Sequence, residues 1–240
     1  MALVSAIVLS RPDSKKLANC LKSLDWADEK IVIKNSNITD FSKIRNQAAK
    51  KAKGDWLFYV DDDERCTPPL RDEILKLVQD DGYSAYDIPR KNIILGQWMR
   101  HMGQWPDRVL RLIKKDALVG WEGQLHEQPK IKGLSAGRWG KLGHLENPLL
   151  HQKHDNLEEM VAKTNDWSEV EAGLMFEAKH PPMNIPRFCT AMAREFWQRM
   201  IIQAAFLDGP KGIIYALYQV FSRFVSYAKL WEIQNARGNL

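Results

Sequence analysis

The sequence has few cysteines and no apolar run long enough to cross a membrane. Its 240 residues include three cysteines, Cys20, Cys66 and Cys189, which lie far apart and form no CxxC pair. Neither a zinc site nor a disulfide framework is therefore indicated, and a reducing compartment fits best. No stretch of about 18 uncharged apolar residues occurs, so no membrane-spanning helix is expected. The first residues also lack the basic and then apolar pattern of a signal peptide.

Internal repeats, low-complexity tracts and clear linkers are absent as well, and the composition is that of a soluble globular protein. Hydrophobic residues make up 45% and charged residues 27% of the chain, which is long enough for one large domain or a domain with an appendage. The net charge of +5 indicates an anionic partner such as a nucleotide, a phospholipid surface or nucleic acid. The basic residues are scattered rather than gathered in one stripe with aromatic residues, which argues against nucleic acid.

The chain is organised around an apolar run that leads directly into four acids. Trp56 to Val60 are apolar, and Asp61, Asp62, Asp63 and Glu64 follow. The run predicts a buried strand, and ligands of open α/β sheets bind where such strands end. Two carboxylates about 4 Å apart repel by roughly 4 kcal/mol at an effective dielectric near 20, so a cation or a basic partner should offset them. Mg²⁺ or Mn²⁺ would suit these oxygen ligands; the alternative is an acidic turn with solvated side chains.

The first sixty residues predict alternating strands and helices. Strands are expected at 3–9, 30–33 and 56–60, and helices from Pro12 onward and over 41–52. This alternation predicts parallel pairing with right-handed crossovers and hence a nucleotide-binding half-sheet. Further on we expect a helix at 70–78, strands at 83–88, 92–95 and 108–113, and loops at 96–106 and 121–129.

The last third of the chain is predicted to be helical. Asp155 and Glu158 have the spacing of a capping box, and an apolar face continues from there. Two more helices are expected at 187–207 and 211–232, separated by Gly209-Pro210. The predicted fold class is thus α/β, a Rossmann-like and mostly parallel sheet flanked by helices, followed by a C-terminal helical extension. The expected division is 1–150 and 151–240.

Several segments together resemble family 2 glycosyltransferases of the GT-A fold, and within them the bacterial lipopolysaccharide-core β-glucosyltransferase group. The segments that carry this resemblance are CLKSLDWADEKIVI (20–33), FSKIRNQAAKKAKGDWLFYVDDDER (41–65), WEGQLHEQP (121–129) and FLDGPKGIIYALYQVFSRFVSYAKLWE (206–232). PLLHQKHDNLEEMVAKTNDWSEVEA (148–172) matches in character. They span nearly the whole chain in the order found in the family.

The resemblance implies transfer of a sugar from a nucleotide-sugar donor with inversion at the anomeric carbon. It implies that Asp61 and Asp63 are the DxD acids that hold a divalent metal, Mg²⁺ or Mn²⁺, on the donor diphosphate. Asp62 belongs to the same donor-binding segment. Arg45 and Arg65 lie close in sequence and are candidates to assist; the alternative, favoured for Arg65, is charge balance for the acids.

An inverting transfer also needs a base that accepts the proton of the acceptor hydroxyl. His126 and Glu127 lie in the segment that matches the acceptor-side His-Glu motif of the family. We expect Glu127 to be the base and His126 to be a metal ligand or a donor to the diphosphate; the alternative is a surface His-Glu pair. Asp107 is the reserve candidate for the base, and His151 is expected to be a structural histidine.

The resemblance further implies a glycan or lipid-linked acceptor of the cell envelope. The expected location is cytoplasmic, with peripheral contact at the inner face of the membrane through residues 211–234, which interleave apolar residues with Lys and Arg. The alternative for this segment is a helix packed on the catalytic domain.

Three departures from the family pattern support a second hypothesis. Lys34 and Asn35 stand where the family usually has an aspartate that reads the uridine, and Ser10-Arg11 stand where it has Asn-Glu. Asp40 also runs directly into Phe41, so a helix and an edge strand usual in the family are missing. The second hypothesis is a degenerate, non-catalytic domain that binds glycans or a partner.

Overall fold

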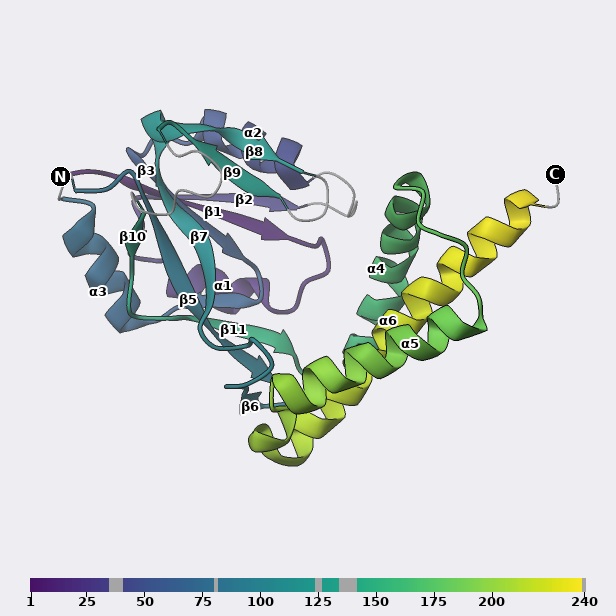
Figure 1. The fold of residues 1–240 in the computed structure, drawn as a ribbon. Coiled ribbons are helices and arrows are strands. Elements are labelled where there is room, and N and C mark those ends of the chain that lie inside the picture. The colour runs from purple at the N-terminus through teal and green to yellow at the C-terminus, as the bar shows by residue number, and fades with distance from the viewer. Residues whose placement is uncertain (35–40, 80–81, 124–126, 134–141, 239–240) are drawn as a thin grey trace. The chain divides into compact units, whose positions relative to one another are not determined.

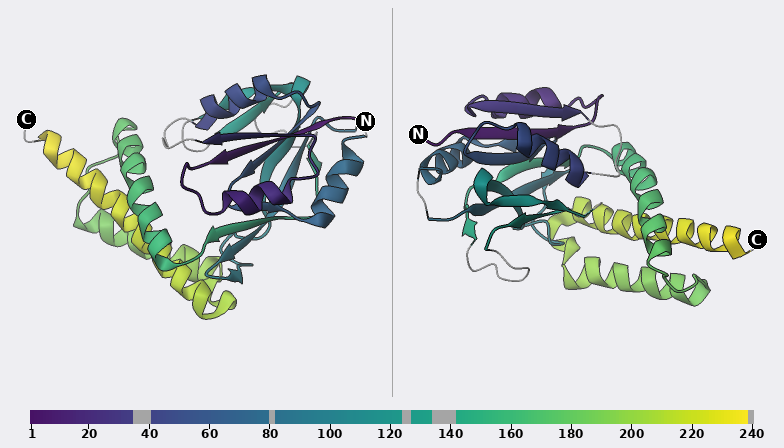
Figure 2. Two further views of the ribbon diagram at one scale, coloured as in Figure 1. Left: turned by 180° about the vertical axis from the view of Figure 1, so that it is seen from behind. Right: turned by 90° about the horizontal axis from the view of Figure 1, so that it is seen from above.

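The computed structural model describes residues 1–34, 41–79, 82–123, 127–133 and 142–238. The chain forms two compact units, the first comprising residues 1–91 and 106–152 and the second comprising residues 92–105 and 153–240. Figure 1 and Figure 2 show the strands and the first three helices of the first unit and the helices of the second.

The first unit is built on a sheet whose N-terminal strands are parallel. Strands β1 (Val4–Ser10), β2 (Glu29–Lys34) and β3 (Trp56–Asp61) lie in the order β2-β1-β3, with Ile7 opposite Ile31 and Tyr59. All residues of β1 are buried, as are all of β3 except its last. This confirms the parallel pairing predicted from the alternating pattern.

The remaining strands make the sheet mixed, and the order continues from β3 as β7-β5-β11-β4. β7 pairs antiparallel with β3 and β5, and β11 pairs antiparallel with β4. A separate antiparallel hairpin is formed by β8 and β9. The bounds are β4 (Glu64–Cys66), β5 (Ala85–Ile94), β6 (Gln97–Trp98), β7 (Asp107–Lys114), β8 (Leu118–Glu122), β9 (Gln128–Ile131), β10 (Gly143–His144) and β11 (Leu149–His154), with a 3₁₀ turn η1 (Lys115–Ala117) before β8.

Helices cover both faces of this sheet (Figure 1). On one face lie α1 (Leu17–Ser23) and α3 (Pro68–Leu77). The buried side chains of Leu24, Leu70 and Phe58 belong to the hydrophobic core on this face. On the other face, α2 (Phe41–Lys51) and the β8–β9 hairpin enclose Tyr59 and Trp121. Burial raises the pKa of the thiols of Cys20 and Cys66 to about 12.

Several predicted boundaries were wrong for identifiable reasons. The helix expected from Pro12 begins only at Leu17. The two strands expected at 83–88 and 92–95 are one strand, because Pro89 and Arg90 pair with Arg108 and Asp107. The loops expected at 96–106 and 121–129 contain β6 and parts of the β8–β9 hairpin. Strands β4 and β11 were not predicted, because both are polar and β4 has only three residues.

The second unit is helical and also contains β6. Its long elements are α4 (Leu157–Glu177), α5 (Ile185–Phe196) and α6 (Gly209–Gly238), with η3 (Trp197–Ile202) and η4 (Ala205–Asp208) between the last two. Asn156, rather than Asp155, caps α4 by accepting a hydrogen bond from the Glu159 amide. The helix expected at 187–207 ends as the π-helical η3, because Ala204 adopts a left-handed conformation. Among the described residues, no helix has the length and apolarity needed to cross a membrane.

Candidate functional site

The acid cluster lies at the turn that joins β3 to β4. Asp61 is the last residue of β3, Asp62 and Asp63 form the turn, and Glu64 begins β4. The Glu64 side chain is fully buried, and its Oε2 accepts a hydrogen bond of 2.9 Å from the Asp61 amide. The acids therefore stand where a buried strand ends, as predicted, but Glu64 points into the protein.

Asp61 is held by two buried arginines from different elements. Arg45 of α2 donates from Nη2 to Oδ1 at 3.1 Å, and Arg111 of β7 donates to Oδ2. Burial alone raises the pKa of Asp61, but the two guanidinium groups outweigh this effect and hold the pKa below its ordinary value. For Arg111, burial lowers the pKa, but Asp61 and Glu64 outweigh it and raise the pKa. Asp61 is thus a charged carboxylate with basic partners on both oxygens.

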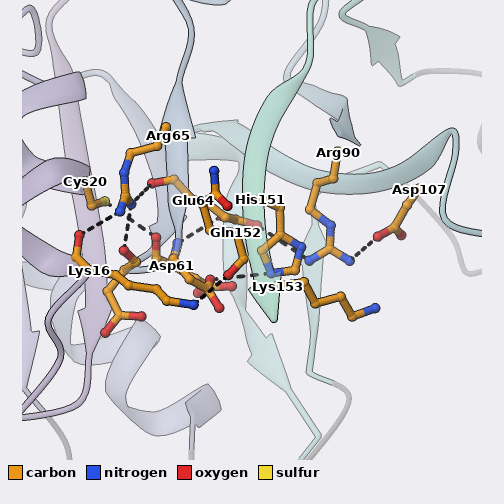
Figure 3. Close-up of polar contacts among 12 residues, drawn as sticks. Lys16, Cys20, Asp61, Glu64, Arg65, Arg90, Asp107, His151, Gln152 and Lys153 are labelled. Carbon is orange, nitrogen blue, oxygen red and sulfur yellow. Dashed lines mark hydrogen bonds and ion pairs between the residues drawn. The ribbon is translucent and has the colours of Figure 1, made fainter. Parts of the chain in front are cut away.

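Glu64 extends the ion-pair network toward Asp107 (Figure 3). Its Oε1 lies 3.3 Å from Nη2 of Arg111 and 3.5 Å from Nη1 of Arg90. Arg90 also donates to Asp107 at 2.6 Å. Asp107, the reserve base of the sequence analysis, therefore connects to the acid cluster through one arginine.

Glu127 connects to the same cluster from the other side. Its Oε1 accepts a hydrogen bond of 3.1 Å from Nε of Arg45, the residue that also binds Asp61. The Arg45 guanidinium lies 4.7 Å from the centre of the Trp121 ring and 5.7 Å from that of Tyr59. Cation–π contact of this kind fixes the arginine in place. Arg45 thereby holds two acids that are 66 residues apart in sequence.

The hairpin that leads to Glu127 is attached to α2 by Asn46. The Asn46 side-chain amide donates to the Trp121 carbonyl at 3.0 Å, and its oxygen accepts from the Trp121 amide at 2.8 Å. Gly120 fits against the same side chain, because a Cβ there would lie 3.3 Å from Asn46 Oδ1. Neighbouring residues of one helix therefore hold both Trp121, near the end of β8, and Glu127.

The turn acids and Arg65 have other partners. Asp62 accepts hydrogen bonds from the Ser10 hydroxyl at 2.9 Å and the Arg11 amide at 3.3 Å. Asp63 Oδ1 lies 3.5 Å from Nε2 of His151 on β11. Arg65 donates to the carbonyls of Asp62, Glu64 and Lys16 at 2.7–2.9 Å, so it fixes the turn backbone rather than neutralising one carboxylate.

The network unites most of the residues singled out from the sequence. Arg45, Asp61 and Glu127 are in direct contact, and Asp107 joins them through Arg90, Glu64 and Arg111. His126 lies outside the described residues. Sequence reasoning missed Arg111 and Arg90, although an arginine within the otherwise apolar strand 109–113 is itself a signal of a buried acidic partner.

The carboxylates of the turn are oxygen ligands of the kind that a divalent cation prefers. Asp61, Asp62 and Asp63 follow one another at the end of β3. Within the described residues, no three His, Cys, Asp or Glu side chains form a metal-binding group. Mg²⁺, however, is commonly bound by one or two carboxylates together with substrate phosphates.

Comparison with known proteins is consistent with this site. Residues 10–128, which include Arg45, the turn acids and Glu127, match the family described as Glycosyl transferase family 2. An uncharacterized glycosyltransferase of Rickettsia bellii (strain RML369-C) is 21% identical over 96% of this chain and 86% of its own length. One of Rickettsia felis (strain ATCC VR-1525 / URRWXCal2) is 22% identical over 97% and 90%.

Solved structures with a similar chain path include S. aureus TarS 1-349, with a TM-score of 0.41 and 12% identity over 99% of this chain and 91% of that one. The TarS 1-349 complex with UDP-GlcNAc gives a TM-score of 0.42 and 11% identity over 99% and 92%. Asp61, Glu64 and Glu127, which the arginines bind, all lie within the residues that match this family. Residues 10–128 are a glycosyl transferase family 2 domain, and the chain is a glycosyltransferase.

Proposed function

We propose that the chain transfers a sugar from a nucleotide-sugar donor, with inversion, to a glycan or lipid-linked acceptor of the cell envelope. The observation that carries this proposal is the contact chain Glu127–Arg45–Asp61 at the end of β3, inside the family 2 match. These contacts bring Glu127, a carboxylate able to accept a proton, close to Asp61, an acid able to bind the nucleotide-sugar donor through a metal ion. The first unit is the proposed catalytic part.

In this proposal, Asp63 and Asp61 bind the donor diphosphate through Mg²⁺ or Mn²⁺. A bound cation would neutralise the charge that develops on the diphosphate as it leaves. Each Asp61 oxygen accepts from an arginine, but a carboxylate oxygen has two lone pairs, so a further ligand is compatible with these contacts. Arg45 and Arg111 fix the orientation of Asp61.

Glu127 is the proposed base. Arg45 occupies its Oε1, and Oε2 accepts no hydrogen bond from the described residues. Oε2 would take the proton of the acceptor hydroxyl while the hydroxyl oxygen bonds to the anomeric carbon and the diphosphate leaves. Asp107 stays the reserve candidate, although its contact with Arg90 at 2.6 Å places it farther along the network.

The test is a donor-hydrolysis and transfer screen with Mn²⁺ and a panel of nucleotide-sugars. We expect wild type to bind and hydrolyse one of them, and Asp63→Ala and EDTA treatment to abolish hydrolysis. Glu127→Gln should retain donor binding while its transfer rate falls by about 10²–10⁴-fold. Arg71→Gln, a surface substitution on α3, is the control and should behave as wild type.

A second candidate is the non-catalytic domain, and the double arginine clamp on Asp61 favours it, because such a clamp would also serve as a purely structural ion pair. Isothermal titration separates the two. Absence of binding to every nucleotide-sugar in the panel, with Mn²⁺ present, supports the non-catalytic domain and rejects the enzyme mechanism above.

We also propose peripheral membrane contact through residues 211–234. Along α6, exposed apolar side chains recur at helical spacing; they are Ile214, Leu217, Phe221, Phe224 and Trp231. Lys211 and Arg223 lie among them, which suits an anionic membrane surface. In liposome flotation, Leu217→Ser with Phe221→Ser should reduce binding relative to wild type; equal flotation of both proteins contradicts this contact.

A further inference from the structure

The second unit contains a cavity of about 270 Å³ that the proposed transfer does not use. It is lined by α5, by Tyr227 of α6 and by His180 and Met183, which precede α5. Its volume is close to the lower end of the range for small-ligand sites. The pocket therefore has room for a phosphate group with a small attached moiety.

Two arginines give this cavity its charge. Arg187 and Arg194 are seven residues apart on α5, almost two helical turns, so both lie on the face that lines the cavity together with Thr190 and Ala191. In the described part of the chain, no acidic residue lines the cavity. Two guanidinium groups in this lining produce a positive potential that attracts anions.

The guanidinium groups of these two arginines have no acceptor among the described residues. In the part of the chain that the structure describes, the side chains of Arg187 and Arg194 form no ion pair or hydrogen bond, whereas Arg199 of the same region pairs with Glu195 at 2.8 Å. Arg223 is also engaged, since it lies 6.0 Å from the centre of the Tyr227 ring. The donors of Arg187 and Arg194 are therefore available to a ligand.

The rest of the lining is suited to the same ligand. The His180 ring packs against the Tyr227 ring with 5.7 Å between centres, and its Nδ1 is hydrogen-bonded to the Pro181 carbonyl at 2.9 Å. His180 and Tyr227 thus form a packed aromatic part of the lining. Met183 adds an apolar side chain to the lining. The cavity therefore combines hydrogen-bond donors for an anion with an apolar surface for a carbon chain.

We propose that this cavity is a binding site for the phosphate group of a phosphate ester, held by Arg187 and Arg194. Guanidinium groups bind phosphate with paired, parallel hydrogen bonds, and two of them can satisfy most of its oxygens. A soluble phosphate compound and a phospholipid headgroup present the same group to the pocket. The proposal is independent of the proposed transfer reaction, because all its residues belong to the second unit.

The experiment compares wild type with the double variant Arg187→Gln/Arg194→Gln. The matched control is Arg71→Gln/Lys76→Gln, which removes the same charge from the exposed side of α3. Binding of pyrophosphate is measured by calorimetry in EDTA, so that no metal site contributes. Co-sedimentation is measured with phosphatidylcholine vesicles, with and without phosphatidic acid. Circular dichroism confirms that all three proteins are folded.

We expect the double variant to lose at least about tenfold in affinity for pyrophosphate, for phosphatidic acid vesicles or for both, while the control keeps wild-type affinity. Loss with pyrophosphate alone identifies a soluble phosphate compound as the ligand, and loss with vesicles identifies a lipid headgroup. Undiminished binding by the double variant, equal loss in the control, or no binding by wild type in either assay overturns the proposal.

Discussion

Replacing Arg111 with methionine should destabilise the protein strongly, because it would leave a buried acid without its nearest basic partner. The Arg111 side chain is only 7% exposed, and it contacts both Asp61 and the fully buried Glu64. After the substitution Asp61 keeps Arg45, and the basic partner left to Glu64 among the described residues is Arg90, whose nitrogen is 3.5 Å away. Removing one member of a buried ion pair typically costs about 3–5 kcal/mol of unfolding free energy.

The assay is thermal unfolding followed by circular dichroism. At about 2–4 °C per kcal/mol for a chain of this size, a loss of about 3 kcal/mol lowers Tm by about 6–12 °C. Arg71→Met is the matched control, because its ion pair with the adjacent Asp72 lies on the surface, and it should leave Tm unchanged.

A second variant shows whether the uncompensated charge is the cause. In Arg111→Met/Glu64→Gln the buried carboxylate is gone, while the glutamine side-chain oxygen still accepts the hydrogen bond of the Asp61 amide. We expect this variant to recover at least about half of the Tm loss. A single variant as stable as wild type, or a double variant no better than the single one, would refute the electrostatic reasoning.

Three further predictions concern the rest of the molecule. Because Arg111 and Arg45 hold the folded-state pKa of Asp61 below 3.8, their contribution to stability is present above about pH 3.8 and is lost as pH falls through the folded-state value. Acid titration of unfolding should therefore be less steep in Arg111→Met than in wild type; identical profiles would contradict this. Gly54→Ala should lower the unfolding free energy in urea by about 1–3 kcal/mol, because its Cβ would lie 2.6 Å from a backbone nitrogen of β1; wild-type stability would exclude this clash. Iodoacetamide at about pH 8 should label one thiol, the exposed Cys189, and Cys189→Ser should abolish labelling; modification of the folded Cys189→Ser variant would show that a buried thiol is accessible.

The sequence predicted the parts of the fold that depend on local apolar patterns. β1 and β3 are continuous apolar runs, and the strand-helix alternation determined their parallel pairing. Strand β11 was missed because LLHQKH has little apolar pattern, and it forms only by pairing with β4. The cap of α4 was misplaced by one residue because Asp155 and Asn156 are both good capping residues.

The candidate site shows the same limit. Four consecutive acids after a buried strand mark the position of the cluster without any knowledge of the fold. Their basic partners Arg90 and Arg111 come from β5 and β7, and only the antiparallel return of these strands brings them to the end of β3. Arg65 was predicted to balance the charge of the acids because it is close to them in sequence. In the structure its guanidinium group donates hydrogen bonds to the backbone carbonyls of Asp62 and Glu64.

Helix α2 holds the residues on both sides of the segment that joins β8 to β9. Asn46 holds the Trp121 backbone through its amide and its oxygen, and Arg45 holds Glu127 on the far side of that segment. Both anchors lie on the helix, so neither depends on how many residues connect them. Glu127, the proposed base, is thus positioned by α2 rather than by its neighbours along the chain.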